Sequence, residues 1–248
     1  MIEARAPADD LYGERVVATD PQAVAEAAAE WIAEISRRAI AEHGRCSIAL
    51  AGGGTPRLLY ELLATDEWRD RIDWAAWHVF FGDERACPPD DSQSNFHLAA
   101  TTLLSRVPIE ATRVHRMPAD RADLDASATE YSALLSSELP AGPGGAPRLD
   151  VVLLGLGENG HTASLFPGTP ALDVTDRWAV RGRADYAPFD RMTLTFPAIN
   201  AASSVGFLVT GTGKRGALAA TARGEAPASR VRPVDGSLTW FLDEAAAG

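Results

Sequence analysis

Cysteine is scarce in this chain, which has Cys46 and Cys87 as its only two in 248 residues. Two cysteines this far apart give neither a disulfide framework nor the ligand spacing of a zinc site. None of the five histidines stands at metal-ligand spacing from another histidine or from a cysteine. We therefore expect free thiols in a reducing cytoplasm, no disulfide and no bound metal.

Long apolar runs and an excess of positive charge are also missing. A membrane-spanning helix needs about 18 or more consecutive apolar residues, and the chain contains no such run. The N-terminal segment carries Glu3, Asp9 and Asp10 in place of the apolar core of a signal peptide. The net charge of -11 argues against nucleic acid or an anionic membrane as a partner. We expect a cytoplasmic protein in which a few local cationic groups and backbone N–H groups attract any anionic ligand.

What the chain does contain is an alternation of apolar strands and amphipathic helices. This pattern predicts one α/β domain over residues 1–248, with a mostly parallel, Rossmann-like open sheet, helices on both faces and a small appended strand/helix region. The expected helices are Pro21–Glu42, Arg57–Leu63, Phe96–Leu104, Asp123–Leu139 and Arg215–Ala222. The expected strands are Arg15–Ala18 at an edge, Cys46–Ala51, Trp77–Phe81, Val151–Leu154, Trp178–Val180, Met192–Phe196 and Val205–Thr210.

The stretch from Leu149 to Pro167 is the most informative part of the chain. A buried strand, Val151–Leu154, runs into three glycines and then His161. A histidine just beyond the carboxyl end of a strand lies where open α/β sheets bind ligands. The apolar residues at 163, 165 and 166 predict a short helix after it. The glycines also match the dinucleotide-binding pattern G-x-G-x-x-G, but Pro167 ends any helix too early for that fold unit.

Three other strands end in turns with functional character. Gly52-Gly53-Gly54-Thr55-Pro56 leads into a helix, with Thr55 as the expected N-cap, and such a turn can bind an anion through its N–H groups. Asp83-Glu84-Arg85 follows another strand, and Gly211-Thr212-Gly213-Lys214 follows a third. Each alone is compatible with a tight turn, a solvated loop or a surface lysine. Together they place polar groups at the carboxyl ends of several parallel strands, which meet at one edge of a sheet.

These stretches together resemble the 6-phosphogluconolactonase family, within the larger group that includes glucosamine-6-phosphate deaminase. The matching segments are Leu50–Leu59, Phe81–Arg85, Ser94–Leu98, Leu153–Pro167, Arg191–Asn200 and Leu208–Lys214. Two departures stand out. Family members usually have an aspartate at the position of Asn159. The segment before Arg191, which is usually rich in lysine and proline, here reads ADYAPFD over residues 184–190.

The resemblance implies a hydrolase that converts 6-phospho-D-glucono-1,5-lactone into 6-phospho-D-gluconate in the oxidative pentose phosphate pathway, without a cofactor. We expect His161 to activate water as a general base, with a helix N-terminus near it opposing protonation. Asp83 would orient His161 or bind a sugar hydroxyl. The predicted phosphate- and substrate-binding residues are Gly53, Gly54, Thr55, Arg85, Asn159, Gly160 and Lys214. Ser164 lacks the G-x-S-x-G setting of a serine nucleophile.

Two other functions remain open. A deaminase or isomerase acting on a sugar phosphate needs a carboxylate base, which Asn159 cannot provide. A non-catalytic sensor would bind the sugar phosphate without accelerating its hydrolysis. In every case the expected partner is a small sugar phosphate, bound by a monomer with no nucleic acid or membrane partner.

Overall fold

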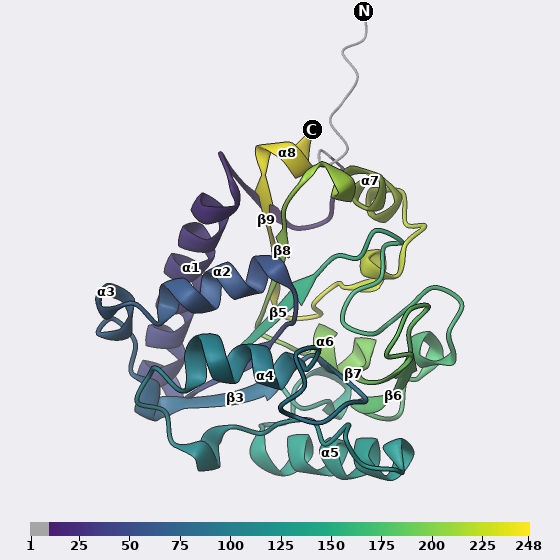
Figure 1. Cartoon of the computed structure of the whole chain (residues 1–248), viewed down its shortest axis with the longest axis horizontal. Helices are drawn as coiled ribbons and strands as arrows, with labels where there is room; N and C mark the ends of the chain where they lie inside the picture. The colour runs from purple at the N-terminus through teal and green to yellow at the C-terminus, as the bar shows by residue number, and fades with distance from the viewer. Residues whose placement is uncertain (1–9) are drawn as a thin grey trace, which may run out of the picture.

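Two β-sheets organise the fold, which a computed structural model describes for residues 10–248 (Figure 1). Six parallel strands form the larger sheet in the order β1-β9-β8-β5-β2-β3, and three antiparallel strands form the smaller sheet in the order β4-β7-β6. The mostly parallel sheet with a small appended region is therefore confirmed. Glu3 and Asp9 lie outside the described residues. The strands are β1 (Glu14–Ala18), β2 (Cys46–Leu50), β3 (Trp77–Phe81), β4 (Asp83–Arg85), β5 (Val151–Gly155), β6 (Ala179–Arg183), β7 (Asp190–Leu194), β8 (Ser204–Val209) and β9 (Ser237–Asp243).

Helices flank the larger sheet, with α1 and α2 on the left of β8 and β9 in Figure 1 and α7 on their right. Local sequence signals define the longest of them. The Asp20 carboxylate accepts a hydrogen bond from the N–H of Ala23 at 2.9 Å, Pro21 occupies the first turn, and Gly44 ends the helix with a φ of 79°. The α-helices are α1 (Pro21–His43), α2 (Gly54–Leu63), α3 (Asp66–Arg69), α4 (Asn95–Ala99), α5 (Leu124–Glu138), α6 (Phe196–Asn200), α7 (Arg215–Ala222) and α8 (Glu244–Ala247). Among residues 10–248, no helix combines the length and apolarity needed to cross a membrane.

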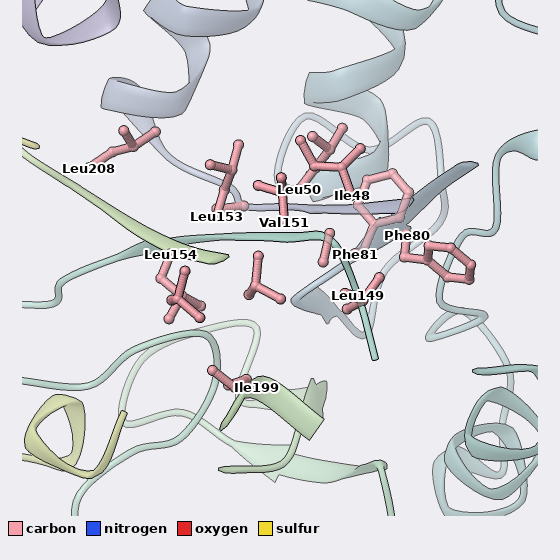
Figure 2. Close-up of a cluster of buried hydrophobic side chains, with 14 of the residues drawn as sticks. Ile48, Leu50, Phe80, Phe81, Leu149, Val151, Leu153, Leu154, Ile199 and Leu208 are labelled. Atoms are coloured by element: carbon pink, nitrogen blue, oxygen red, sulfur yellow. The ribbon is translucent and has the colours of Figure 1, made fainter. Parts of the chain in front are cut away.

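The hydrophobic core lies on both faces of the larger sheet. Alternate residues of a strand point to opposite faces, and Figure 2 shows Leu153 and Leu154 of β5 on opposite sides of the strand. Both side chains are almost fully buried, as are the residues of β2 and β8. A parallel strand that is covered on both faces reads as a continuous apolar run, which is why these strands were predictable.

The strand order reverses between β2 and β5. From β2 the chain continues outward to β3, whereas β5, β8 and β9 extend the sheet in the other direction. The carboxyl ends of β2 and β5 therefore flank a crevice, the usual place for a ligand in an open α/β sheet. Gly82 joins the two sheets, because its N–H donates to Leu50 at 2.9 Å and its C=O accepts from Leu194 at 2.8 Å.

Several local predictions were wrong. No helix follows His161, because Ala163 adopts a left-handed φ of 47° and residues 162 and 165 form a short β-bridge instead. Thr55 is not an N-cap, since α2 already begins at Gly54 after Gly53, whose φ is 109°. The Thr55 hydroxyl instead contacts that of Thr210 at 2.8 Å.

The predicted strand Met192–Phe196 is displaced, because β7 ends at Leu194 and Phe196 begins α6. No strand was predicted for the C-terminal segment. It forms β9, which lies between β1 and β8 in the larger sheet.

Candidate active site

A cavity of about 560 Å³ opens at the crevice between β2 and β5. Its lining brings together six of the nine residues predicted for the site, namely Gly53, Asp83, Arg85, Asn159, His161 and Lys214. Gly54 lines a smaller adjoining pocket of about 190 Å³, which shares Gly53 and Arg85 with the larger one. Turns from four separate parts of the chain thus converge on one site.

The other two predicted residues lie outside both linings and serve the turns. The Thr55 hydroxyl is engaged with Thr210. Gly160 is buried in the turn that presents His161, with a φ of 77°, and its N–H donates to the C=O of Gly157 at 2.9 Å. A Cβ at Gly160 would stand 2.4 Å from the Cβ of Ala226. A side chain at Gly160 is therefore excluded both by the backbone conformation and by the neighbouring chain.

His161 is oriented by a chain of polar groups that ends in a carboxylate. Nδ1 of His161 lies 2.6 Å from Oδ1 of Asn159, and Nδ2 of Asn159 donates to Oδ2 of Asp185 at 2.9 Å. An ionised carboxylate only accepts hydrogen bonds, so Asp185 fixes the amide of Asn159 with its oxygen toward the histidine. That oxygen in turn requires a proton on Nδ1, which leaves the lone pair of His161 on Nε2.

Packing holds the imidazole in this orientation. The His161 ring stacks on Phe166 with a centroid distance of 3.9 Å and an interplanar angle of 18°. A Cβ at Gly157 would lie 2.0 Å from Nδ1 of His161, so a glycine is required on this side of the ring.

The environment of His161 favours the neutral imidazole. Burial lowers the pKa of His161 to about 4, against the opposing effect of the Asp83 and Asp185 carboxylates. The positive charges of Lys214 and Arg191 lower it further. The pKa of His161 is therefore lowered, as predicted. The cause is burial and not the predicted helix N-terminus, since no helix begins at His161.

Asp83 has partners other than His161. Its Oδ1 accepts from Nδ2 of Asn95 at 2.9 Å, and its Oδ2 accepts from Oγ of Ser164 at 2.6 Å. Because Asn159 occupies Nδ1 of His161, Asp83 does not supply the orienting hydrogen bond that was considered for it. A Cβ at Gly52 would lie 1.8 Å from Oδ1 of Asn95, so the first glycine of the turn leaves room for the side chain that holds Asp83.

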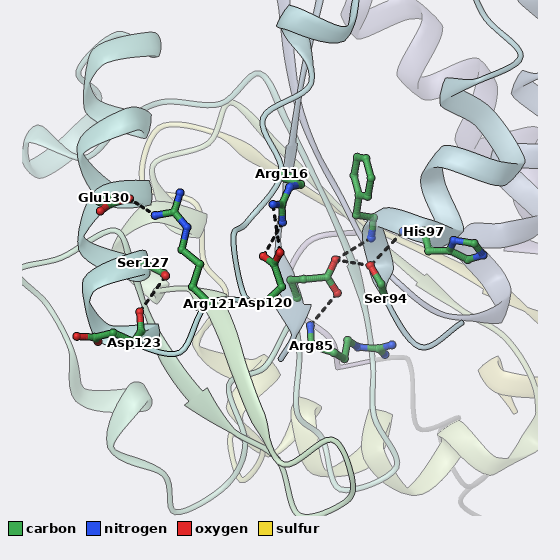
Figure 3. A network of polar contacts seen from close by, with 11 residues as sticks. Arg85, Ser94, His97, Arg116, Asp120, Arg121, Asp123, Ser127 and Glu130 are labelled. Atoms are coloured by element: carbon green, nitrogen blue, oxygen red, sulfur yellow. Dashed lines mark hydrogen bonds and ion pairs between the residues drawn. The ribbon is translucent and has the colours of Figure 1, made fainter. Parts of the chain in front are cut away.

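Of the next two residues, Glu84 stabilises the fold and Arg85 lines the cavity. The Glu84 carboxylate is buried and accepts from the N–H groups of Arg85, Asn95 and Phe96 at 2.7–2.8 Å and from the hydroxyl of Ser94 at 3.0 Å. Burial raises the pKa of Glu84, whereas these four donors act in the opposite direction. Figure 3 shows Ser94 and Arg85 within this network. Glu84 thus ties β4 to the start of α4, while the Arg85 side chain reaches the cavity.

Arg191 is a site residue that the sequence analysis did not assign. It lines the cavity although it is only 1% exposed, and among residues 10–248 neither Nη1 nor Nη2 has a hydrogen-bond partner. Arg191 in β7 stands directly opposite Arg85 in β4, and like charges in that position destabilise a sheet. An unpaired buried cation beside a second one indicates a site for an anion. The available signal was an arginine next to an alternating apolar segment, but the predicted strand began only at Met192 and so left Arg191 out.

Lys214 and the divergent 184–190 segment complete the cavity wall. Lys214 lies in a short turn just before α7, and within residues 10–248 its ammonium forms no ion pair. Asp185 and Tyr186 also line the cavity. The Tyr186 ring lies 5.2 Å from the guanidinium of Arg191, so the segment that departs from the family pattern contributes directly to the site.

Comparisons with known proteins identify the family to which the chain belongs. The family model for glucosamine-6-phosphate isomerases and 6-phosphogluconolactonases matches residues 19–240. A 6-phosphogluconolactonase from Nostoc sp. is 45% identical over 213 residues, covering 84% of this chain and 86% of the relative. One from Synechocystis sp. is 44% identical over 214 residues, with the same coverage. The structure of 6-phosphogluconolactonase from Trypanosoma brucei superposes with a TM-score of 0.84 at 30% identity, covering 96% of this chain and 98% of the other. This chain therefore belongs to the glucosamine-6-phosphate isomerase/6-phosphogluconolactonase family.

Proposed function

We propose that the protein hydrolyses 6-phospho-D-glucono-1,5-lactone to 6-phospho-D-gluconate, as a step of the oxidative pentose phosphate pathway. One observation carries the proposal. A neutral histidine with its Nε2 lone pair available shares a cavity with three cationic side chains, Arg85, Arg191 and Lys214. That combination suits a substrate with a phosphate at one end and a carbonyl to be attacked by water at the other. Relatives named 6-phosphogluconolactonase support the same conclusion.

His161 acts as the general base in this proposal. Nε2 removes a proton from a water molecule as the water oxygen attacks the lactone carbonyl carbon, which forms a tetrahedral intermediate. The ring C–O bond then breaks, and the imidazolium returns the proton to the departing ring oxygen. A positioned base of this kind contributes about 10²–10⁴-fold to the rate. Asn159 and Asp185 maintain the required tautomer.

The three cations bind the phosphate. A phosphate monoester carries about 1.5–2 negative charges near pH 7, so its binding relieves the repulsion between Arg85 and Arg191. An arginine guanidinium can donate two parallel hydrogen bonds to a phosphate, and Lys214 adds a point charge. The turn at Gly53-Gly54 adjoins Arg85 and would supply backbone N–H groups at the start of α2.

Asp83 binds a sugar hydroxyl and stabilises the transient imidazolium. Its carboxylate retains acceptor capacity beside its hydrogen bonds from Asn95 and Ser164. The Ser164 hydroxyl donates to Asp83, and the residue is only 1% exposed. Both observations argue against a covalent route through this serine. Water activation is therefore favoured over an acyl-enzyme.

The monomeric state, the cytoplasmic location and the single domain stay predictions.

A second candidate function is deamination or isomerisation of a sugar phosphate. The specific observation in its favour is Asp83, a carboxylate in the cavity that could move a proton between adjacent carbons. The relatives at 44–45% identity favour the lactonase.

The decisive experiment follows the decay of freshly generated 6-phosphogluconolactone. The rate above that of the uncatalysed blank is compared for the wild type, for His161→Ala and for His97→Ala, which removes a histidine outside the cavity. We expect His161→Ala to lower kcat by at least about 10²-fold and His97→Ala to leave it unchanged. Equal loss in both variants would contradict the role of His161. No acceleration by the wild type would refute the lactonase. Release of ammonia from glucosamine 6-phosphate would then support the deaminase, and tight binding without turnover would support a sensor.

A further inference from the structure

Two histidines and a glutamate converge near the opposite end of β3 from the active site. His78 is the second residue of β3, His115 lies in the segment after residues 111–113, and Glu138 is the last residue of α5. One ligand atom from each lies within 4.8 Å of those of the other two. His78 precedes Asp83 by five residues of extended chain, roughly 16 Å. The cluster is therefore separate from the substrate cavity.

The distance between the imidazoles suits two ligands of one metal ion. Nδ1 of His78 lies 3.5 Å from Nε2 of His115. This is longer than a normal hydrogen bond, which spans about 2.7–3.2 Å between heavy atoms. Two nitrogens bound at about 2.0–2.1 Å to a tetrahedral metal are about 3.4 Å apart.

The fold holds both histidine backbones in place before any metal binds. The N–H of His115 donates to the C=O of Val79 at 2.7 Å, and its C=O accepts from the Tyr131 hydroxyl at 3.1 Å. The His115 ring stacks on Phe80 at 4.6 Å between centroids. His78 is fixed by the pairing of β3 with β2. Preorganised ligands lose little conformational freedom on binding, which favours affinity.

Charge also favours a cation at this position, with one opposing contribution. Glu138 ends a helix of 15 residues, where the exposed carbonyl groups attract positive charge. Within the described part of the chain Glu138 forms no ion pair, so its carboxylate is available. Arg45 and Arg113 act on His78 with positive charge, which opposes a metal ion and makes the Glu138 carboxylate necessary.

We propose that His78, His115 and Glu138 bind a divalent transition metal of the zinc type, with solvent completing the coordination. Two imidazoles and one carboxylate match zinc and cobalt, whereas magnesium and calcium prefer oxygen ligands alone. The bound ion would tie β3, the segment around residue 115 and the end of α5 together, and so stabilise the fold without entering the lactonase reaction. The expectation of no metal rested on sequence spacing, which does not register histidines 37 residues apart.

Two measurements on the full chain after chelator treatment test the proposal. One is the zinc affinity, determined by competition, and the other is the absorption spectrum of bound cobalt. The variants are His78→Ala, His115→Ala and Glu138→Gln, the last keeping the test valid if a histidine variant fails to fold. Loss of a residue that only hydrogen-bonds to a metal ligand weakens metal binding by about 10–100-fold. Because these variants remove a ligand itself, we expect zinc binding to be weaker by at least about 100-fold in each. Zinc should also raise the Tm of the wild type but not of the variants.

Two matched controls separate this site from other histidines. His161→Ala removes the active-site imidazole, and His43→Ala removes one that lies 3.1 Å from Asp150. Both should bind zinc as the wild type does, and Glu138→Gln should keep full lactonase activity with or without zinc. The proposal is overturned if micromolar zinc does not bind, if all variants bind it equally, or if only His161→Ala abolishes binding. None of these zinc-binding results depends on whether the protein is a lactonase.

Discussion

Two substitutions would move the negative charge that acts on His161 from residue 185 to residue 159, whose side chain contacts the imidazole directly. At present Asp185 accepts from Asn159, and Asn159 faces Nδ1 of His161. The double variant Asn159→Asp/Asp185→Asn preserves this chain of hydrogen bonds but places the negative charge directly against the imidazole. It also restores the aspartate that the resemblance to the family leads one to expect at position 159. We predict that the double variant stays active and that the pKa of its His161 rises.

The size of the effect follows from the distances. Opposite charges about 4 Å apart interact by about 4 kcal/mol at an effective dielectric constant of about 20. Since one pKa unit corresponds to about 1.36 kcal/mol, the upper bound is about 3 units. The gain is smaller than this bound because the charge of Asp185 already raises the pKa of His161. We therefore expect the pKa to rise from about 4 to between about 5 and 7.

The two single variants complete a double-mutant cycle. Asn159→Asp alone places two carboxylates where a 2.9 Å hydrogen bond now exists, and such a pair cannot remain fully ionised. It should take up a proton or separate, and kcat should fall. Asp185→Asn alone removes a charge that raises the pKa of His161, so that pKa should fall further.

The assay is an NMR titration of the His161 ring protons, together with the acid limb of the kcat profile. In the double variant both should move upward by the same amount. An unchanged pKa of His161 in the double variant would refute the argument. Full kcat in Asn159→Asp alone, with no extra proton bound, would refute it as well.

The parts of the fold that could be predicted depend on local interactions. The limits of α1 follow from the Asp20-Pro21 start and from Gly44, and β3 was predicted without error because aromatic and β-branched residues end at a glycine. The location of the site was also predictable. Parallel strands place their carboxyl ends at one edge, so the turns after β2 and β5 had to meet near the switch in strand order.

The remaining features depend on contacts between distant parts of the chain. Arg191 faces Arg85 only because β4 leaves the larger sheet and pairs with β7, which no local pattern indicates. Asp185 reaches Asn159 from a segment 26 residues away. The absence of a helix after His161 follows from the left-handed backbone of Ala163, a residue with no intrinsic preference for that conformation. Sequence reasoning therefore placed His161 at this edge of the sheet, but it missed Asp185 and Arg191, which come to the cavity from distant segments.

Three further predictions concern the same cavity. Because the pKa of His161 is lowered to about 4, the base stays neutral as the pH falls, and a kcat profile of the wild type should hold its plateau well below the ordinary histidine value of about 6.5. Gly157→Ala should lower kcat more than it raises KM in steady-state assays, since the new Cβ would collide with the His161 ring. Arg191→Met should raise KM for the lactone by about 10- to 100-fold, because a charged hydrogen bond to phosphate contributes about 1.5–3 kcal/mol. Arg181→Met, a change of an exposed arginine on the neighbouring strand, is the control and should leave KM unchanged. The Tm distinguishes binding from structure. Removing an unpaired buried charge that faces Arg85 should maintain or raise the Tm of Arg191→Met, whereas a lower Tm with unchanged KM would show that the arginine serves the fold and not the phosphate.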